Sequence, residues 1–294
     1  MPTFAPYFRF MMYKNFVLYC LSLVMVGVLL SCGGNGRKVT DVDELHRQDS
    51  LDSASDTLNL VPEEDEPSRS VDELFDDFFF TFVTNQRFQM RRIVFPLPWN
   101  DGDVARTVGR GEWAGHNRFI FQDVFSVIFE DDEDIAVRND TSVHRVSIEW
   151  IDFETDSADI YTFRKSDGEW FLRTVNRTGL QDMSNGVFLR FLSRFVNDST
   201  FQAESVEQPL RIVASDDMDE GGDGEELSVD AAEWGSIRQE FPLPGRELVN
   251  IDYGQPSGSV RYKQVLMVGM NDGMYVKFKF HKFSTDWKLI EIEE

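Results

Sequence analysis

Side chains suited to acid–base chemistry near neutral pH are scarce in this chain, which has four histidines among 294 residues. They are His46, His116, His144 and His281. A histidine acts as a catalytic base only when a second polar group orients it and a substrate lies within hydrogen-bond reach. The chain has no HExxH, glycine-rich phosphate loop or GxSxG sequence to supply that context. We therefore identify no catalytic residue from the sequence.

An acidic run at residues 216–223 has the composition of a calcium loop. An EF-hand loop needs oxygen ligands at its first, third and fifth positions and a glutamate at its twelfth. With Asp217 as the first position, the fifth is Gly221 and the twelfth is Ser228, so the pattern fails twice. We predict a solvated loop there, and neither a metal nor a cofactor.

Two tryptophans recur with an acidic residue before them and an arginine close behind. These residues are Trp113 with Arg118, and Trp234 with Arg238. An indole ring offers a large flat surface with one polar hydrogen, which suits either a binding pocket or a packing anchor. Both interpretations stay open, and packing is the one that we favour.

The most specific chemistry belongs to Cys32, one of two cysteines in the chain. Basic residues precede an apolar run over residues 16–30, which suits an export signal and is short for a membrane span. The run ends in Leu-Leu-Ser-Cys, which resembles the bacterial lipobox, whose cysteine is diacylated and becomes the mature N-terminus. We expect residues 1–31 to be a lipoprotein signal peptide, with a plain signal peptide or anchor helix as the alternative. The other cysteine, Cys20, would leave with the signal, so no disulfide or thiolate nucleophile is expected.

Residues 32–69 are predicted to be a disordered acidic tether, because they lack aromatic residues and carry many carboxylates. Three Asp-Ser/Thr-apolar triplets within the tether resemble the O-glycosylation acceptor of certain Gram-negative gut anaerobes. Their hydroxyl residues are Ser50, Ser53 and Thr57. The alternative is that an acidic, serine-rich linker contains such triplets by chance.

The formal net charge of −23 makes nucleic acid an unfavourable partner, since like charges repel. Surface charge would also repel anionic headgroups, so the membrane is expected to be a partner only through the lipid on Cys32. We expect a cell-envelope protein, lipid-anchored to a bacterial membrane that we predict to be the outer one.

The rest of the chain repeats itself. A stripe of apolar residues at helical spacing recurs in the same order further along, as Phe75, Phe78, Phe79 and Phe82, then as Phe188, Phe191, Leu192 and Phe195. A hairpin pattern recurs too, as Phe163 with Trp170 and as Phe280 with Trp287. Ser70 and Glu73 have the spacing of a capping box before the first stripe. Each copy therefore predicts a helical segment followed by antiparallel strands, an α+β domain.

This layout resembles the cone-shaped fold of the nuclear transport factor 2 and ketosteroid isomerase (NTF2-like) superfamily. Together with the lipobox, it resembles uncharacterised tandem NTF2-like lipoproteins of Gram-negative gut anaerobes. The resemblance implies two cone-like domains, at residues 70–181 and 182–294, each a helical segment on a curved antiparallel sheet. It also implies a monomer whose repeats pair as a dimer of this fold does. Such cones hold a ligand, act catalytically or are filled by side chains, so the fold alone does not give the function.

Three functions remain open. We favour a non-catalytic, membrane-anchored envelope lipoprotein that binds a small ligand or an envelope protein. The alternatives are an isomerase or dehydratase that uses a cone pocket, and a structural component of an envelope assembly. An open cone with convergent polar groups would indicate a ligand or substrate, whereas filled cones would indicate assembly.

Overall fold

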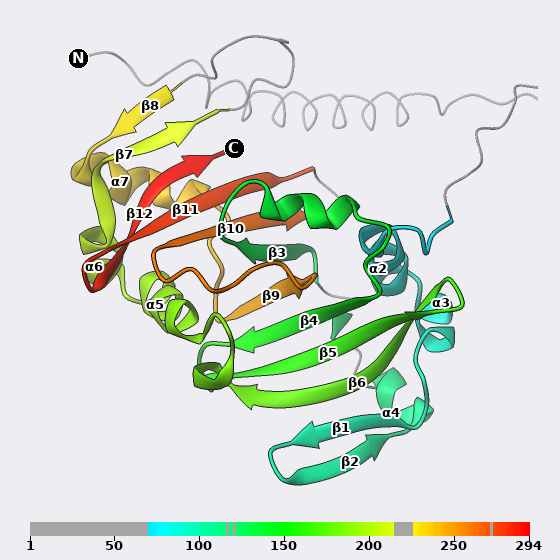
Figure 1. Cartoon of the computed structure of the whole chain (residues 1–294). Coiled ribbons are helices and arrows are strands. Elements are labelled where there is room, and N and C mark those ends of the chain that lie inside the picture. The colour runs from blue at the N-terminus through cyan, green and yellow to red at the C-terminus, as the bar shows by residue number, and fades with distance from the viewer. Residues whose placement is uncertain (1–69, 116–117, 120–121, 215–225, 271–272) are drawn as a thin grey trace, which may run out of the picture. The chain divides into compact units, whose positions relative to one another are not determined.

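Figure 1 shows a computed structural model of the chain, which describes residues 70–115, 118–119, 122–214, 226–270 and 273–294. The chain divides into two compact units, Met1–Glu63 and Glu64–Glu294, and every described residue belongs to the second. The expectations that fall outside the described residues concern the signal peptide 1–31, Cys32, the tether 32–69, Ser50, Ser53, Thr57, His46, His116 and the acidic run 216–223. Among the described residues no helix is long and apolar enough to cross a membrane.

The described strands form one curved sheet in the order β2-β1-β6-β5-β4-β9-β3-β10-β11-β12-β7-β8. The strands are β1 (Leu97–Asp101), β2 (Val104–Val108), β3 (Val124–Phe129), β4 (Arg145–Asp152), β5 (Ser157–Ser166), β6 (Glu169–Gly179), β7 (Val206–Val213), β8 (Glu226–Val229), β9 (Glu247–Asp252), β10 (Tyr262–Gly269), β11 (Tyr275–Phe283) and β12 (Asp286–Glu293). Neighbouring strands are antiparallel except β1 with β6, β7 with β12 and β3 with β9. The predicted mixed α+β class is confirmed, but the sheet is mixed and not purely antiparallel.

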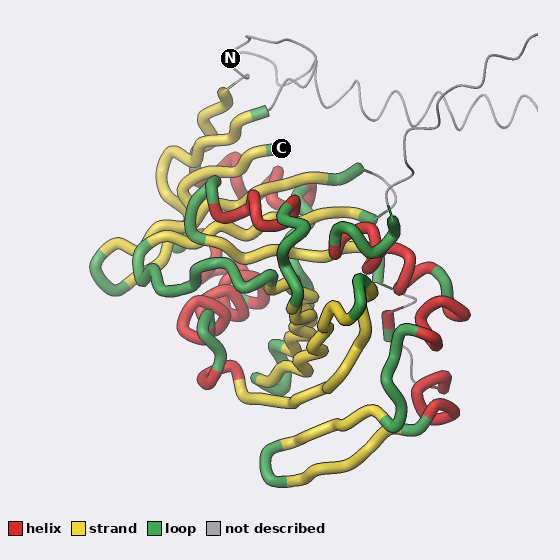
Figure 2. Tube along the Cα trace, turned by 45° about the vertical axis from the view of Figure 1, so that its right-hand side comes forward, coloured by secondary structure: helices red, strands yellow, loops and turns green. Residues whose placement is uncertain are grey.

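Short helices lie against this sheet (Figure 2). The α-helices are α2 (Phe75–Thr84), α3 (Gln86–Arg91), α4 (Arg110–Gly115), α5 (Gly186–Asn197), α6 (Ser199–Glu204) and α7 (Ala231–Ile237). The 3₁₀ helices are η2 (Asp134–Asn139), η3 (Leu180–Asp182) and η4 (Arg238–Glu240). Helices α2 and α5 carry the two predicted apolar stripes, whose residues are mostly buried. Burial of that face, worth about 1.5–3 kcal/mol for each large side chain, stabilises the helices in place.

The start of α2 differs from the prediction. Helix α2 begins at Phe75, and the hydroxyl of Ser70 accepts a hydrogen bond from the Asp72 backbone at 3.3 Å instead of capping it. The expected capping box is therefore absent. The turn instead positions Asp72 to accept two hydrogen bonds from the Arg92 guanidinium, at 2.7 and 2.9 Å. A buried charged pair replaces the capping interaction at this end of the sheet.

Two strands are exchanged between residues 70–181, here called the first half, and residues 182–294, the second half. Strand β9 belongs to the second half but pairs with β4 of the first half over six residues. Strand β3 belongs to the first half but pairs with β10 of the second half. The exchanged strands meet in parallel at Ser126 and Asn250, in the middle of the sheet. The sheet is thus continuous, where separate sheets for the two copies were expected.

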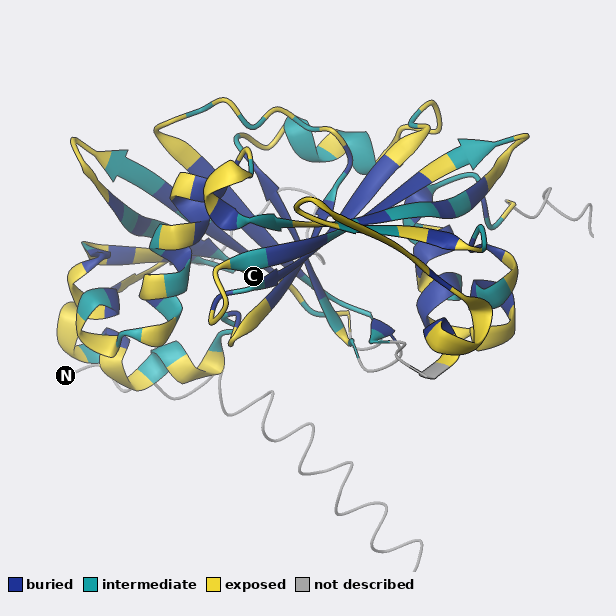
Figure 3. Cartoon of the chain, turned by 90° about the horizontal axis from the view of Figure 1, so that it is seen from below, coloured by how far each residue is buried: buried dark blue, intermediate teal, exposed yellow. Residues whose placement is uncertain are grey.

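The described residues form two apolar clusters, on opposite faces of the central strands. Figure 3 shows the buried residues gathered along those strands. Successive residues of a strand point to opposite faces, so one strand can serve both clusters. In β9, Val249 belongs to the cluster around α2 and Leu248 to the cluster around α5. In β10, Leu266 and Val265 are divided in the same way.

Aromatic side chains fill the space between the sheet and the two longest described helices, α2 and α5. Trp170 packs on Phe75 with ring centroids 5.0 Å apart, and Trp287 packs on Phe188 at 5.2 Å. Each hairpin tryptophan therefore packs against the helix of its own half. Register and helix contacts therefore relate β4–β6 to β10–β12 position by position.

Candidate functional site

The two recurring tryptophans lie inside the molecule, with 5% of Trp113 and 1% of Trp234 exposed. The Trp113 indole donates to Gln89 Oε1 at 3.0 Å. At the corresponding place in the second half, Gln202 Oε1 instead accepts from Arg238 Nη1 at 2.8 Å. Both glutamines also donate to a helix carbonyl, so they tie the short helices to α2 and α5. Trp113, Trp234 and Arg238 thus lie in packing positions.

Arg118 behaves differently from Arg238, because it extends across the sheet. Its guanidinium carbon lies 4.2 Å from the centroid of the Trp150 ring on β4. Its Nη2 donates to Glu247 Oε1 on β9 at 2.6 Å, while the other Glu247 oxygen accepts from the Trp150 indole at 3.0 Å. The stacking on Trp150 and the hydrogen bond to Glu247 together fix the orientation of the Arg118 guanidinium.

Asp159 on β5 is the buried anion beneath Arg118. Only 3% of the residue is exposed, and Arg177 of β6 clamps its carboxylate with bonds of 2.8 and 3.0 Å. Arg118 Nη1 approaches the same carboxylate at 3.4 Å. Two guanidinium groups therefore neutralise one carboxylate, which keeps the buried charge tolerable. We call Arg118, Trp150, Asp159, Arg177 and Glu247 the Asp159 cluster.

The local sequence explains how the cluster is positioned. Asp159 and Tyr161 are two residues apart on β5 and so share a face. Asp159 is directly opposite Trp150 on one neighbour and Arg177 on the other. Burial raises the pKa of Tyr161 well above its usual value, Asp159 raises it further, and the Arg118 cation offsets part of the shift. Tyr161 therefore stays protonated at neutral pH and is not a base.

The corresponding positions of the second half are apolar. The register that pairs Trp150 with Asp159 pairs Met267 with Val276. Val276, Phe278 and Met267 are buried in the α5 cluster where Asp159, Tyr161 and Trp150 stand in the first half, and Val124 corresponds to Glu247. The same backbone framework thus closes over an apolar interior in one half and over a charged cluster in the other.

Two other groups of hydrogen-bonded polar side chains lie near the exchanged strands. Glu149 of β4 accepts from Asn250 Nδ2 at 2.7 Å, and Asn250 Oδ1 accepts from the Ile128 backbone at 2.9 Å. Burial, with the Asp252 charge nearby, raises the pKa of Glu149 to about 7, although the bond from Asn250 acts against this. On the α2 side, Asp76 accepts from the Tyr253 hydroxyl and from Arg138 of η2. Both groups fix β9 against the first half.

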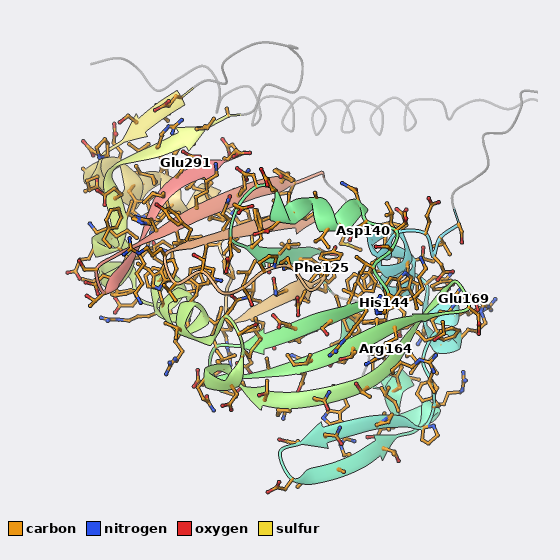
Figure 4. All side chains as sticks on the ribbon, in the orientation of Figure 1. Phe125, Asp140, His144, Arg164, Glu169 and Glu291 are labelled. Atoms are coloured by element: carbon orange, nitrogen blue, oxygen red, sulfur yellow. The ribbon has the colours of Figure 1, made fainter. Side chains whose placement is uncertain are left out.

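Open grooves lie at the surface near some of these groups. One of about 540 Å³ is lined by Asp152, Arg246 and Glu247, which places it beside the Asp159 cluster. Among the described residues there is no group of histidine, cysteine and carboxylate side chains that could hold a metal ion. His144 is exposed just before β4 (Figure 4). His281 of β11 stacks on Tyr262 of β10 and meets Phe283 edge to face. Neither histidine joins the cluster.

Sequence reasoning found Arg118 but not its partners. Asp159 and Tyr161 stand in a strand pattern where the other copy has Val276 and Phe278, and that contrast was the available signal. Glu247 gave no signal, because it lies 129 residues from Arg118 and reaches it only through strand exchange.

Comparison with known proteins places the chain by family. The sequence profile described as "Domain of unknown function (DUF4348)" matches residues 54–294. The structure is similar to the crystal structure of an NTF2-like protein from Bacteroides fragilis NCTC 9343, with 30% sequence identity and a TM-score of 0.68. That similarity covers 76% of this chain and 96% of the other. No curated protein matches the sequence.

Proposed function

The chain belongs to the DUF4348 family, and from that premise we propose that it is a non-catalytic envelope lipoprotein that binds a small ligand at the Asp159 cluster. In this proposal residues 70–181 and 182–294 are two NTF2-like units that descend from one ancestor. The similarity to an NTF2-like protein is consistent with a ligand-binding domain. The first unit would keep a binding site, and the second would have a filled interior.

The observation that carries the proposal is the contrast between corresponding positions. Replacing buried ion pairs by well-packed apolar residues is often neutral or stabilising. The second half closes the same framework with Val276, Phe278 and Met267, so folding does not require the charges of the first half. Retention of Asp159 with two arginines therefore favours a role in recognition.

The chemistry of the cluster favours a small, hydroxyl-rich ligand such as a sugar. The side chains of Arg118, Arg177 and Glu247 are 38%, 44% and 43% exposed, so each presents planar hydrogen-bonding groups to solvent. Nearby, the Arg106 guanidinium stacks over Trp99 at 4.7 Å from the ring centroid. Convergent polar groups beside aromatic rings are typical of sites that fix the orientation of a small molecule.

Catalysis has weaker support at this site. A general base needs a free lone pair and a pKa matched to its task. The carboxylate of Asp159 is occupied by Arg177 and Arg118, and the raised pKa of Tyr161 keeps its hydroxyl protonated. Glu149 has a pKa near neutrality, but it lies on the opposite strand face from Trp150 and is hydrogen-bonded to Asn250. The isomerase or dehydratase alternative thus lacks an available base among these groups.

The envelope location rests on the lipobox-like sequence at Cys32 and on the acidic tether that follows it. The lipid would hold the chain at the membrane, and the tether would let the folded unit reach ligands away from the lipid surface. Glycosylation at Ser50, Ser53 and Thr57 forms part of this proposal. The intact mass of the mature protein tests both modifications, since acyl chains and glycans each add a defined mass.

A sugar titration tests the binding proposal. Neutral and acidic oligosaccharides are added to the protein while its tryptophan fluorescence is followed, because Trp150 and Trp99 lie at the site. We expect saturable binding that Arg118→Ala weakens by at least about tenfold, the equivalent of 1.4 kcal/mol. Arg238→Ala is the matched control, since Arg238 follows the recurring tryptophan of the second half but bonds to Gln202. An absence of saturable binding, or an equal loss in both variants, contradicts the proposal.

A further inference from the structure

The two halves also differ at the ends where their short helices meet the final hairpin. In the first half this end is sealed by Arg92, which is 8% exposed and bonds to Asp72, to the Trp170 carbonyl and to Glu169. Its guanidinium lies over the Phe88 ring at 4.7 Å. Figure 4 shows Glu169 at this end of the sheet, beside α3.

Ser205 holds the corresponding position in the second half. Its backbone accepts from Leu289 at 2.8 Å, as the Arg92 backbone accepts from Leu172 at 2.8 Å. Asn185 corresponds to Asp72, and its Oδ1 is buried with no hydrogen-bond partner among the described residues. The arginine and aspartate that seal the first half are therefore both missing from the second.

A groove of about 730 Å³ lies where the seal is missing, between α5, α6 and the β11–β12 hairpin. Its apolar wall includes Phe191 and Val187, and Val187 is 62% exposed. Its rim carries four cationic side chains and two carboxylates: Arg190, Arg194, Lys282, Lys288, Glu204 and Asp286. This excess of positive charge stands out in a chain whose net charge is −23.

Two of the rim cations are uncommitted. Within the described parts of the chain Arg190 makes no ion pair, and Lys282 only approaches the Trp287 ring at 5.9 Å. Lys288 is paired with Glu207 at 3.3 Å, and Arg194 stacks on Phe201 at 3.9 Å. Uncommitted cations beside an apolar wall attract carboxylates that are joined to apolar side chains.

We propose that this groove is a docking site for an acidic peptide segment of a partner protein, with apolar side chains against Val187 and Phe191 and carboxylates at Arg190 and Lys282. A peptide fits this groove because it can present carboxylates to the rim cations and apolar side chains to the apolar wall at the same time. The site is separate from the Asp159 cluster, so either proposal can fail alone.

The test uses the mature chain and a fluorescein-labelled peptide, Gly-Gly-Asp-Leu-Phe-Asp-Gly-Gly, with an asparagine-for-aspartate version as the neutral control. We expect fluorescence anisotropy to show binding to the acidic peptide that weakens with added salt. Arg190→Glu and Lys282→Glu should each weaken binding by about five- to tenfold. Arg91→Glu is the control, because it reverses an exposed charge on α3 of the first half and changes the net charge by the same amount. It should leave the affinity within about twofold.

A second variant closes the groove without altering its rim. Ser205→Arg together with Asn185→Asp gives the second half the pair that seals the first half, and it should abolish peptide binding while the fold is retained. Melting curves of each variant check that the fold persists. A Kd above about 1 mM for the acidic peptide overturns the proposal. So does a loss of affinity in Arg91→Glu as large as in Arg190→Glu and Lys282→Glu, or retained binding in the sealed variant. Direct binding of an acidic oligosaccharide, without binding of the peptide, would also overturn it.

Discussion

If the Asp159 cluster is kept for binding, its central carboxylate should be dispensable for folding. The informative change is Asp159→Val, which gives the first half the residue that the second half has at Val276. The reciprocal change is Val276→Asp, which places a carboxylate in the apolar interior of the second half. We expect these two exchanges to have very unequal effects on the free energy of unfolding.

The expected magnitudes follow from exposure. Removing one member of a fully buried ion pair costs about 3–5 kcal/mol, because the other charge stays buried. The orphaned groups here are Arg118 and Arg177, whose side chains are 38% and 44% exposed and can reach water. Valine also adds apolar burial of about 1 kcal/mol, so the net change for Asp159→Val should stay within about 1 kcal/mol. Val276 is 6% exposed, and in the second half Glu294 stands where the first half has Arg177. A carboxylate at position 276 would be buried without a cationic partner there, so Val276→Asp should cost more than about 3 kcal/mol.

Calorimetry and urea unfolding of the Cys32→Ser form, which lacks the thiol proposed to carry the lipid, measure both changes. For a folded unit of this size, 1 kcal/mol corresponds to about 2–4 °C in the melting temperature. Asp159→Val should therefore move the melting temperature by less than about 4 °C, and Val276→Asp should lower it by more than about 6 °C. A loss above about 3 kcal/mol in Asp159→Val would show that the cluster is needed for stability, and the argument from the second half would fail.

Three more outcomes follow from the structure. The pKa of Glu149 is raised to about 7, so in this pH range the folded state holds a proton that the unfolded state releases. The free energy of unfolding should therefore decrease as the pH rises from about 4.5 to about 7. Glu149→Gln should flatten that decrease, and its free energy of unfolding should exceed that of the wild type by about 3 kcal/mol at pH 8. Parallel pH profiles of the two proteins would contradict the raised pKa of Glu149. Residues 70–181 and 182–294, expressed separately, should not fold alone but should form a complex when mixed, as size-exclusion chromatography with circular dichroism can check. Cys32→Ser should move the protein from the membrane fraction to the soluble fraction, and unchanged partitioning would argue against lipid anchoring.

The parts of the fold that sequence could predict are those set by local periodicity. The stripe from Phe75 to Phe82 indicated a helix, and the pattern of Phe163 with Trp170 indicated the β5–β6 hairpin, whose turn in the structure is Asp167-Gly168. Positive φ angles of 52° and 83° at these turn residues match the chemistry of the Asp-Gly pair. These signals depend on residues a few positions apart, so they survive without knowledge of the whole chain.

The polar interactions were harder to foresee. Ser70 and Glu73 had the spacing of a cap, but the intervening Asp72 gains more by pairing with Arg92, which bonds to it twice across the fold. Tertiary contact thus overrode a local preference. Nothing near Asp72 in the sequence marks Arg92 as its partner, because a guanidinium can reach any carboxylate that the fold brings close.

Strand exchange makes the candidate site a product of both halves. Arg118 and Asp159 come from the first half, but the carboxylate that holds Arg118 over Trp150 is Glu247 of β9, from the second half. A truncation at residue 181 would therefore remove Glu247 from the site and would also leave β4 without its neighbour β9. Loss of binding in such a fragment would not distinguish a lost contact from a lost fold. Glu247→Gln in the intact chain separates them, because it leaves β9 paired while the charge that orients Arg118 is removed.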